Sequence, residues 1–524
     1  MFLNIKSFLL IYLLSVSLAV HSKPPQLILS IIVDEIDNDE LLLLQSSFSD
    51  KGFNRLAREG FRFMSAVSHD LAGYPGTRIA SIYSGMNPNE HGIVGEQWYN
   101  YTSEQFSQKV SFDNLNSLLE IRTNIVTRTL GDFVKGFYGP NSKVAAISIN
   151  SPWMTHTLGY YPDYFFTLSP QNGFFYDALN NKEFGWVNEF NSRYSLVDYL
   201  SKQWGPKNDI TSYVEFRYSS DEQRSNFRKF LYDIDAGGKY SKVVASPYGN
   251  TMLRDFIIAF LVNSRFGQDD IPDLLSVCFT TRHFSNNNGT ILPAEKEDML
   301  LRLDIEIASI IDFLDYEFGR KNYLIMFTSA KSPPPNQSSF GKQGITTGYF
   351  DSGNSMSLLN LYLMAVYGQE KWVLGYSDGM IFLNRKVIEQ KGMSLKNMQE
   401  EVALFMHDVS GVAKAMPLFD YMLNTHCDDI FSKNLFPKKM GDVFLTFLPG
   451  WQTTETQLGS RQDGNSGFQS VPFIFFGWNT NKGAWFDNIE TTDLIPLLLK
   501  NLELTHPKIY RTDNVPAFVN PAEN

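Results

Sequence analysis

Short uninterrupted runs of apolar residues recur along the chain and predict buried β-strands. Each run is bounded by polar or turn-forming residues, and the clearest are LILSIIVD (27–34), KVAAISI (143–149), DLLSVCF (273–279), YLIMFTS (323–329) and VPFIFFGW (471–478). A run that is apolar at nearly every position indicates a strand covered on both faces, which is typical of parallel sheets.

Between these runs, apolar residues recur at the three- and four-residue spacing of amphipathic helices. In 294–319 this spacing places on one face Met299, Leu303, Ile307, Ile310 and Leu314. Segments 395–409 and 491–504 show a similar pattern. Strands alternating with helices predict an α/β fold, with a mainly parallel sheet sandwiched between helices. Ligands bind beyond the carboxyl ends of such strands, so the residues following each run are the candidates for a functional site.

Residues 150–245 depart from this alternation. They are richer in Tyr, Phe, Asn and Ser, and their periodicity is less regular. We expect them to form an inserted cap over the main sheet, within one domain spanning 23–524. The aromatic segment GYYPDYFFTL (159–168) allows two interpretations: its rings anchor a partner protein, or they pack the cap onto the core.

The first residues, 1–22, have the order of a secretory signal peptide. Lys6 provides a positive charge, an apolar stretch follows from Phe8 to Leu18, and small residues such as Ala19 and Ser22 come next. The alternative is a membrane anchor, but the apolar run is short for a span of about 20 residues. We therefore expect a periplasmic or secreted protein with no transmembrane segment after cleavage.

Composition narrows the class of partner. The 524 residues carry a formal net charge of −11, which argues against nucleic acid as a main partner. With 43% hydrophobic and 19% charged residues, the chain can build a sizeable core. Its only cysteines are Cys278 and Cys427, too few for a disulfide scaffold, and the sequence does not reveal whether they pair.

Several segments together resemble the alkaline phosphatase superfamily, near the phosphate-irrepressible alkaline phosphatases and the type I phosphodiesterase/nucleotide pyrophosphatases. The resemblance begins with VDEIDNDELLLLQSSFSDKGFNRLAREGFRFMSAVSHD and ASIYSGMNPNEHGIVGEQWYN, and continues through SPYGNTMLRDF, MIFLNRKVIEQKGM, GDVFLTFLPGWQ and SVPFIFFGW. It implies an alkaline-phosphatase-like core and, in active members, two zinc ions held by three Asp and three His. There a Thr or Ser attacks phosphorus while the paired cations stabilise the attacking and leaving oxygens.

The residues at the functional positions of that superfamily are mostly different here. The nucleophile position carries Pro75, which has no hydroxyl group. The positions that hold phosphoryl oxygens carry Glu96, Asn150 and Pro152. The six zinc-ligand positions carry Asp34, His283, Asn287, Ala330, Lys331 and Ser470. Only Asp34 matches the pattern, while Lys331 brings a cation to a metal position and Glu96 an anion to a phosphate position.

The resemblance therefore predicts a secreted pseudoenzyme, with no zinc or other cofactor expected and a binding or scaffolding role. Its partner would be a protein of the cell envelope. The alternative is an active phosphoric or sulfuric ester hydrolase with a rebuilt site. Thr77, two residues after Pro75, is a possible displaced nucleophile, and Asp34, Glu96 and His283 are weak candidates for a single-cation site. His91, in NEHGIVG, is expected to be structural.

Overall fold

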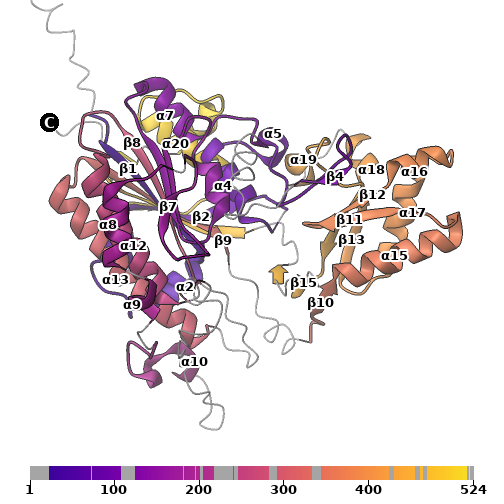
Figure 1. Cartoon of the computed structure of the whole chain (residues 1–524), viewed down its shortest axis with the longest axis horizontal. Helices are drawn as coiled ribbons and strands as arrows, with labels where there is room; N and C mark the ends of the chain where they lie inside the picture. The colour runs from indigo at the N-terminus through magenta and orange to yellow at the C-terminus, as the bar shows by residue number, and fades with distance from the viewer. Residues whose placement is uncertain are drawn as a thin grey trace, which may run out of the picture.

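A ten-stranded sheet forms the centre of the described part of the chain (Figure 1). The computed structural model describes residues 23–71, 73–107, 124–180, 182–194, 196–200, 204–217, 240, 243, 246–281, 292–332, 344–423, 430–454, 461–463, 469–515 and 518–519. In spatial order the strands are β18 (Gly483–Trp485), β2 (Phe61–Ser68), β17 (Gln469–Gly477), β9 (Tyr323–Lys331), β1 (Leu27–Glu35), β8 (Asp273–Phe279), β5 (Val144–Ser148), β6 (Tyr164–Leu168) and β7 (Phe175–Asp177), with β19 (Ile489–Glu490) also beside β2.

The centre of this sheet is parallel, as the apolar runs predict. Strands β9, β1, β8, β5 and β6 pair in parallel, whereas β17 is antiparallel to β9 and β2, and β7 is antiparallel to β6. Each of the five apolar runs forms a strand, and the α/β prediction is confirmed.

Helices cover both faces of the sheet, and a hydrophobic core lies under each layer. One layer contains α2 (Asn38–Leu43), α3 (Phe53–Glu59), α8 (Gly185–Arg193), α9 (Leu196–Leu200), α10 (Val214–Arg217), α12 (Pro247–Ser264) and α13 (Ala294–Glu317). The other contains α4 (Pro75–Ser84), α7 (Leu130–Tyr138), α20 (Leu494–Asn501) and the 3-10 helix η1 (Pro152–Thr157), with α5 (Pro88–His91) beside α4. The five apolar residues expected on one face of 294–319 are all buried in α13.

The segment expected to form a cap, 150–245, lies differently where the structure describes it. Strands β6 and β7 belong to the main sheet, and Phe165 and Phe166 are buried in the two cores beneath it. Burial of these rings in the two cores stabilises the fold more than a separate cap would, because each buried ring removes a large apolar area from water. Tyr161 and Phe174 remain 74% and 43% exposed, so the aromatic residues divide between the two interpretations given for them.

A second lobe comes instead from residues 348–447 (Figure 1, orange). Its four-stranded sheet has the order β11 (Val373–Ser377), β12 (Met380–Leu383), β14 (Val443–Phe447) and β13 (Val412–Pro417). Helices α15 (Ser352–Tyr367), α16 (Arg385–Gln390) and α17 (Leu395–His407) cover one face. The other face packs on the hairpin β3 (Tyr99–Asn100) and β4 (Gln105–Phe106), near α18 (Leu418–Leu423) and α19 (Ile430–Asn434).

Smaller elements complete the described chain. A three-stranded sheet has the order β10 (Gly348–Asp351), β15 (Trp451–Thr454) and β16 (Arg461–Asp463). Short 3-10 helices are η2 (Ile210–Ser212), η4 (Thr491–Asp493) and η5 (Ile509–Thr512). The expected signal peptide, 1–22, and Cys427 lie outside the described residues, whereas Cys278 is a buried free thiol. No helix among the described residues is both long enough and apolar enough to cross a bilayer.

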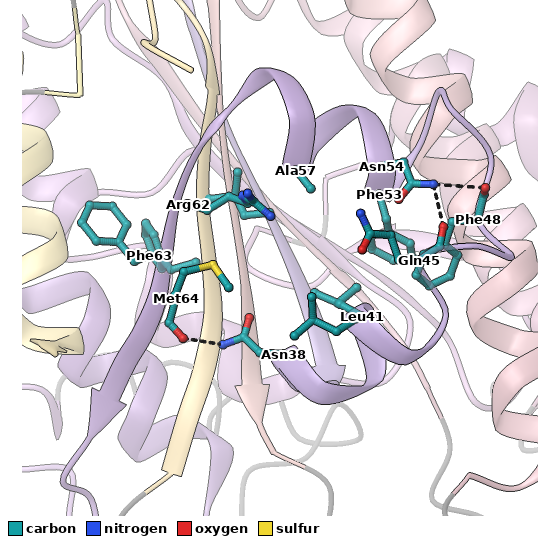
Figure 2. A pocket seen from close by; sticks show the side chains of 13 residues that line it. Asn38, Leu41, Gln45, Phe48, Phe53, Asn54, Ala57, Arg62, Phe63 and Met64 are labelled. Atoms are coloured by element: carbon teal, nitrogen blue, oxygen red, sulfur yellow. Dashed lines mark hydrogen bonds between the residues drawn. The ribbon is translucent and has the colours of Figure 1, made fainter. Parts of the chain in front are cut away.

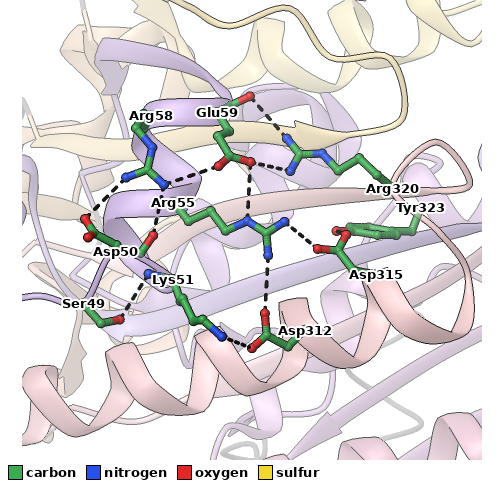
Figure 3. Close-up of polar contacts among 10 residues, drawn as sticks. All are labelled: Ser49, Asp50, Lys51, Arg55, Arg58, Glu59, Asp312, Asp315, Arg320 and Tyr323. Atoms are coloured by element: carbon green, nitrogen blue, oxygen red, sulfur yellow. Dashed lines mark hydrogen bonds and ion pairs between the residues drawn. The ribbon is translucent and has the colours of Figure 1, made fainter.

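Helix α3 is tied to the long helix α13 and to strand β9 by a network of charged side chains (Figure 3). Arg55 contacts Glu59 at 3.4 Å, Asp312 at 3.5 Å and Asp315 at 2.5 Å. Arg320 also reaches Glu59, at 2.7 Å. The short helix α3 is thereby held by polar contacts against α13 and the loop that follows it, in addition to the contacts of its buried residues.

Candidate functional site

The candidate site lies at the carboxyl ends of the adjacent strands β8, β1 and β9. Parallel pairing places Val33 opposite Phe279 and Glu35 opposite Lys331, so all three strands end at the same edge. This is the edge at which α/β sheets bind ligands. Asp34 and Lys331 are brought to it as the sequence predicts, whereas His283 and Asn287 lie outside the described residues.

The Asp34 carboxylate is held entirely by the residues that follow β8. Its Oδ1 accepts hydrogen bonds from the Thr281 backbone N at 2.6 Å and Thr281 Oγ1 at 3.0 Å. Its Oδ2 accepts one from Thr280 Oγ1 at 2.8 Å. Burial raises the pKa of Asp34 to about 6, against the lowering effect of the Thr281 amide. Both oxygens are thus engaged by hydrogen-bond donors of the protein itself.

On the opposite side of β1, two lysines and two glutamates form a largely buried group of ion pairs. Lys331 Nζ lies 2.9 Å from Glu35 Oε2, and Lys296 Nζ, from α13, lies 3.3 Å from Glu35 Oε1. Lys296 also contacts Glu40 at 2.6 Å. The sequence predicts that Lys331 brings a positive charge to a metal position. In the structure this charge is paired with the Glu35 carboxylate. The four side chains, Glu35, Glu40, Lys296 and Lys331, are called the charge cluster below.

Burial and pairing compete in setting the pKa values of the charge cluster. Burial alone would lower the pKa of Lys296, but the neighbouring Glu35 and Glu40 outweigh it and raise that pKa. Burial raises the pKa of Glu40 to about 7, although Lys296 acts in the opposite direction. Such a cluster stabilises the fold only while every member keeps its partner.

The position that the resemblance assigns to the nucleophile lies at the start of helix α4 and carries no hydroxyl group. Pro75 is the first residue of α4, where its missing N–H is not needed and its fixed φ suits the helix. The ring of the preceding Tyr74 covers this turn so closely that a Cβ on Gly76 would lie 2.3 Å from it. Thr77, the possible displaced nucleophile, is fully buried, so its hydroxyl is not exposed for attack on a bound ester.

The other residues that the sequence places at the candidate site do not gather around Asp34. The Glu96 backbone N donates to Asp378 Oδ2, in the second lobe, at 2.7 Å. Asn150 and Ser470 are exposed, whereas Ala330 is buried in the core. Pro152 begins η1, a structural position that suits proline.

A centre of two zinc ions requires a particular set of donor atoms. Each zinc needs about four N, O or S ligands at close range. The described ligand positions carry Asp34, Ala330, Lys331 and Ser470, and of these only Asp34 is an ordinary zinc ligand. Over the described residues, no group of three His, Cys, Asp or Glu side chains could hold a metal ion. The described positions therefore do not fit the two-zinc centre that the resemblance implies.

His91 has the structural surroundings expected of it. Its Nε2 lies 2.9 Å from Ser81 Oγ in α4, and its Nδ1 accepts a hydrogen bond from the Ile93 backbone N at 3.1 Å. Burial lowers the pKa of His91 well below its usual value, which keeps the ring neutral. The side chain joins α4 to α5 and faces no open site.

Sequence reasoning missed the residues that surround the candidate site. The segment TTRHFSNNNG, which begins with Thr280 and Thr281, is a candidate because it follows a strand, but the sequence gives these two residues no particular role. Lys296 is only one polar residue of an amphipathic helix. The acidic residues between Asp34 and Glu40 are expected from the sequence to be partly a remnant of the ligand set and partly a solvated helix start. That expectation does not reveal the cations that Glu35 and Glu40 contact. Strand register decides that point, because it sets Lys331 directly opposite Glu35.

Known proteins similar to this chain span most of its length. The chain is 23% identical to a protein of Myroides odoratus named "Calcium-transporting ATPase" and 22% identical to alkaline phosphatase PafA of Elizabethkingia meningoseptica, each match covering 92% of both chains. It is 21% identical to alkaline phosphatase PhoV of Synechococcus elongatus, with 92% of this chain and 91% of PhoV covered. No protein-family model matches the chain.

Solved structures give the same picture of the fold. The crystal structure of wild-type alkaline phosphatase PafA superposes with a TM-score of 0.80 at 21% identity, covering 92% of this chain and 96% of that one. Human ectonucleotide pyrophosphatase/phosphodiesterase 5 gives a TM-score of 0.53 at 11% identity, covering 93% and 99%. These superpositions confirm an alkaline-phosphatase-like core, and at such identities they concern the fold alone.

Proposed function

This chain belongs to the alkaline phosphatase superfamily, and we propose that it has lost the two-zinc hydrolysis of phosphate esters and acts by binding a protein of the cell envelope. The observation that carries the proposal is the state of Asp34. Thr280 and Thr281 donate three hydrogen bonds to this one retained ligand, which tie the end of β1 to the end of β8. The other described ligand positions carry Ala330, Lys331 and Ser470, which do not supply the further ligands that zinc needs.

The nucleophile position supports the same proposal. Pro75 has no hydroxyl group, and the hydroxyl group of Thr77 is buried. Loss of a nucleophile alone can lower the rate of an enzyme by about 10⁶. Without activation by a metal, a hydroxyl restored at this position would also remain a weak nucleophile.

A binding role accords with where the described surface is apolar. Tyr161 and Phe174 lie in loops next to strands β6 and β7 and are 74% and 43% exposed to solvent. Large aromatic side chains on rigid scaffolds are common anchors in protein interfaces. We propose that these two loops form part of the surface that meets the partner.

Elemental analysis and an assay of ester hydrolysis test the loss of catalysis. The purified protein, loaded with zinc and then desalted, is expected to retain less than one zinc ion per chain and not to hydrolyse p-nitrophenyl phosphate or its bis-ester. Pro75→Thr is expected to remain inactive, because the hydroxyl it restores has no metal to activate it. Two zinc ions per chain, or turnover that Asp34→Asn abolishes, would instead establish a working hydrolase with a rebuilt site.

Site-specific crosslinking tests the binding role. A photoreactive residue at Tyr161 or Phe174 is expected to capture the same envelope protein in intact cells. The matched control is Tyr316, which is 86% exposed on helix α13, on a different part of the surface. Equal capture from all three positions, or capture from none, would contradict the proposed surface.

Export is tested by the N-terminus of the mature protein. We propose cleavage near Ala19 or Ser22, which would leave the protein in the periplasm or the medium. N-terminal sequencing of the protein recovered from its native cells is expected to begin in this region. A mature chain that still begins at Met1 would disprove export by cleavage.

A further inference from the structure

A hollow separate from the candidate site lies between two short helices and the edge of the main sheet (Figure 2). Its walls are α2, α3 and neighbouring strands β2 and β17, and most of its lining is apolar: Leu41, Phe48, Phe53, Met64, Phe473 and Ile474. Its empty volume is about 540 Å³, including the open side. Helices α2 and α3 have six and seven residues, too few to cover this part of the sheet completely.

One cation enters this hollow from the sheet. Arg62 lies on β2, and Figure 2 shows its side chain extending toward the space between Leu41 and Ala57. Its Nε is buried and has no hydrogen-bond partner among the described residues, and no described carboxylate forms an ion pair with it. A buried donor without a partner costs free energy, which a bound acceptor would recover.

The neighbouring amides are already engaged with the backbone. Asn54 Nδ2 donates to the carbonyl oxygens of Gln45 at 2.9 Å and Phe48 at 3.1 Å, and Asn38 Nδ2 donates to that of Met64 at 3.3 Å. These bonds fix the rim of the hollow, and Arg62 is the one cation among the described residues that line it. The hydrogen bonds of the rim therefore keep the hollow open around Arg62.

The entrance to the hollow favours an anion. A wider opening shares Gln45, Asn54, Ala57 and Arg62 with the hollow and adds Asp50, Arg58 and Lys482. Asp50 pairs with Arg58 at 3.5 Å, which leaves Arg62 and Lys482 as cations without a described ion-pair partner. A positive entrance attracts an anion and orients it toward the apolar interior.

From this geometry we propose that the hollow binds a small monocarboxylate with an apolar body, its carboxylate on Arg62 and its body among Leu41, Phe53 and Ile474. Guanidinium binds carboxylate in a planar, two-point arrangement. One interior cation balances one negative charge, whereas a phosphate monoester would bring about two charges into a hollow whose described lining holds a single cation. The site lies away from Asp34 and does not depend on the proposed loss of catalysis.

A series of straight-chain acids tests the proposal by isothermal titration calorimetry on the full chain. From butyrate to octanoate, each added methylene is expected to tighten binding about fourfold, because it removes apolar surface from water. Octanamide, which has the same shape without the charge, is expected to bind at least tenfold more weakly than octanoate. Tighter binding of octyl phosphate than of octanoate would overturn the choice of carboxylate.

Two variants locate the site, and one serves as the control. Arg62→Gln is expected to weaken octanoate binding about ten- to hundredfold, and Ala57→Leu to abolish it by filling the hollow. Lys386→Gln, on α16 of the second lobe and outside the lining of the hollow and of its entrance, is expected to change the affinity less than twofold. Thermal unfolding of each variant confirms that it is folded. No saturable octanoate binding, or equal binding by wild type and Arg62→Gln, would overturn the inference.

Discussion

At the scale of single residues, Asp34 joins two strands of the main sheet through its carboxylate. Its hydrogen bonds join the end of β1 to Thr280 and Thr281 after β8. Burial raises its pKa to about 6 from 3.8, so the folded protein binds the proton more tightly than the unfolded chain. The contribution of Asp34 to stability is therefore complete below about pH 3.8 and is lost as the pH rises through about 6.

The variant Asp34→Asn removes this titration. Its stability relative to wild type is expected to increase between pH 4 and pH 7, by up to about 3 kcal/mol. Urea unfolding of both proteins at each pH measures the difference, and the comparison cancels contributions from other groups such as His91. Asp39→Asn, an exposed change in the same acidic run, is the control. A difference that does not vary with pH would contradict the raised pKa.

A second residue-scale prediction concerns the charge cluster. Lys296 is 3% exposed and contacts both Glu35 and Glu40. Lys296→Met leaves two buried carboxylates with one cation fewer and is expected to cost about 3–5 kcal/mol in urea unfolding. Lys331→Met, at a partly exposed position, is expected to cost about 1 kcal/mol.

Adding Glu40→Gln to Lys296→Met separates lost pairing from lost packing. The double variant is expected to recover part of the stability, because one unpaired carboxylate is removed. If the double variant is as unstable as the sum of the two single changes, the pairing of Lys296 with Glu40 is not what stabilises this region.

At the scale of elements, the charged network of Figure 3 shows which surface pairs matter. Arg55 and Asp315 join α3 to α13 with side chains only 18% and 28% exposed. Arg58 and Asp50 are 54% and 90% exposed, and their contact at 3.5 Å is more open to water and salt. Geometry and exposure together therefore favour the first pair as the one that holds α3.

Double-mutant cycles on the two pairs test this difference. Arg55→Gln with Asp315→Asn is expected to give a coupling energy of about 1 kcal/mol, smaller in 1 M salt. Arg58→Gln with Asp50→Asn is expected to give a coupling near zero. Equal couplings for the two pairs would show that exposure does not govern their strength.

At the scale of the whole molecule, buried polar contacts fasten the second lobe to the main body. Asn434 is 4% exposed at the end of α19. Its Oδ1 accepts from the Leu71 backbone N at 3.1 Å, and its Nδ2 donates to the His69 carbonyl oxygen at 2.7 Å. The Asn434 side chain thus provides hydrogen-bond partners for the backbone groups of His69 and Leu71.

Replacing Asn434 with alanine is expected to loosen this attachment. The change leaves a buried N–H and a buried carbonyl group unpaired, at a cost of about 1–3 kcal/mol in thermal or urea unfolding. Hydrogen exchange at Leu71 is expected to become faster. Asn89→Ala removes a similar contact between the lobes, to the Ser432 carbonyl oxygen, but at an exposed position, and is expected to cost less than 0.5 kcal/mol. Similar losses for both variants would contradict the role of burial.

The sequence by itself determined the elements of this molecule and which residues stand at the positions that the resemblance assigns to a catalytic site. Apolar runs such as 27–34 form strands because nearly all of their side chains are apolar and can be buried on both faces of the sheet. The helical spacing from Met299 to Leu314 forms α13 because it aligns one apolar face. The identity of Pro75 is likewise a fact of sequence, since no fold gives proline a hydroxyl group.

Only the tertiary structure decided which side chains meet. Local pattern does not encode strand register, which pairs Lys331 with Glu35, nor the packing of α13 that brings Lys296 to the same carboxylate. The aromatic segment expected in a cap joined the main sheet, because its rings lose more water-exposed area there. The hollow at Arg62 also depends on tertiary packing, because helices α2 and α3 are too short to cover the strands on which they pack. The sequence of a single helix or strand does not show a gap between two of them.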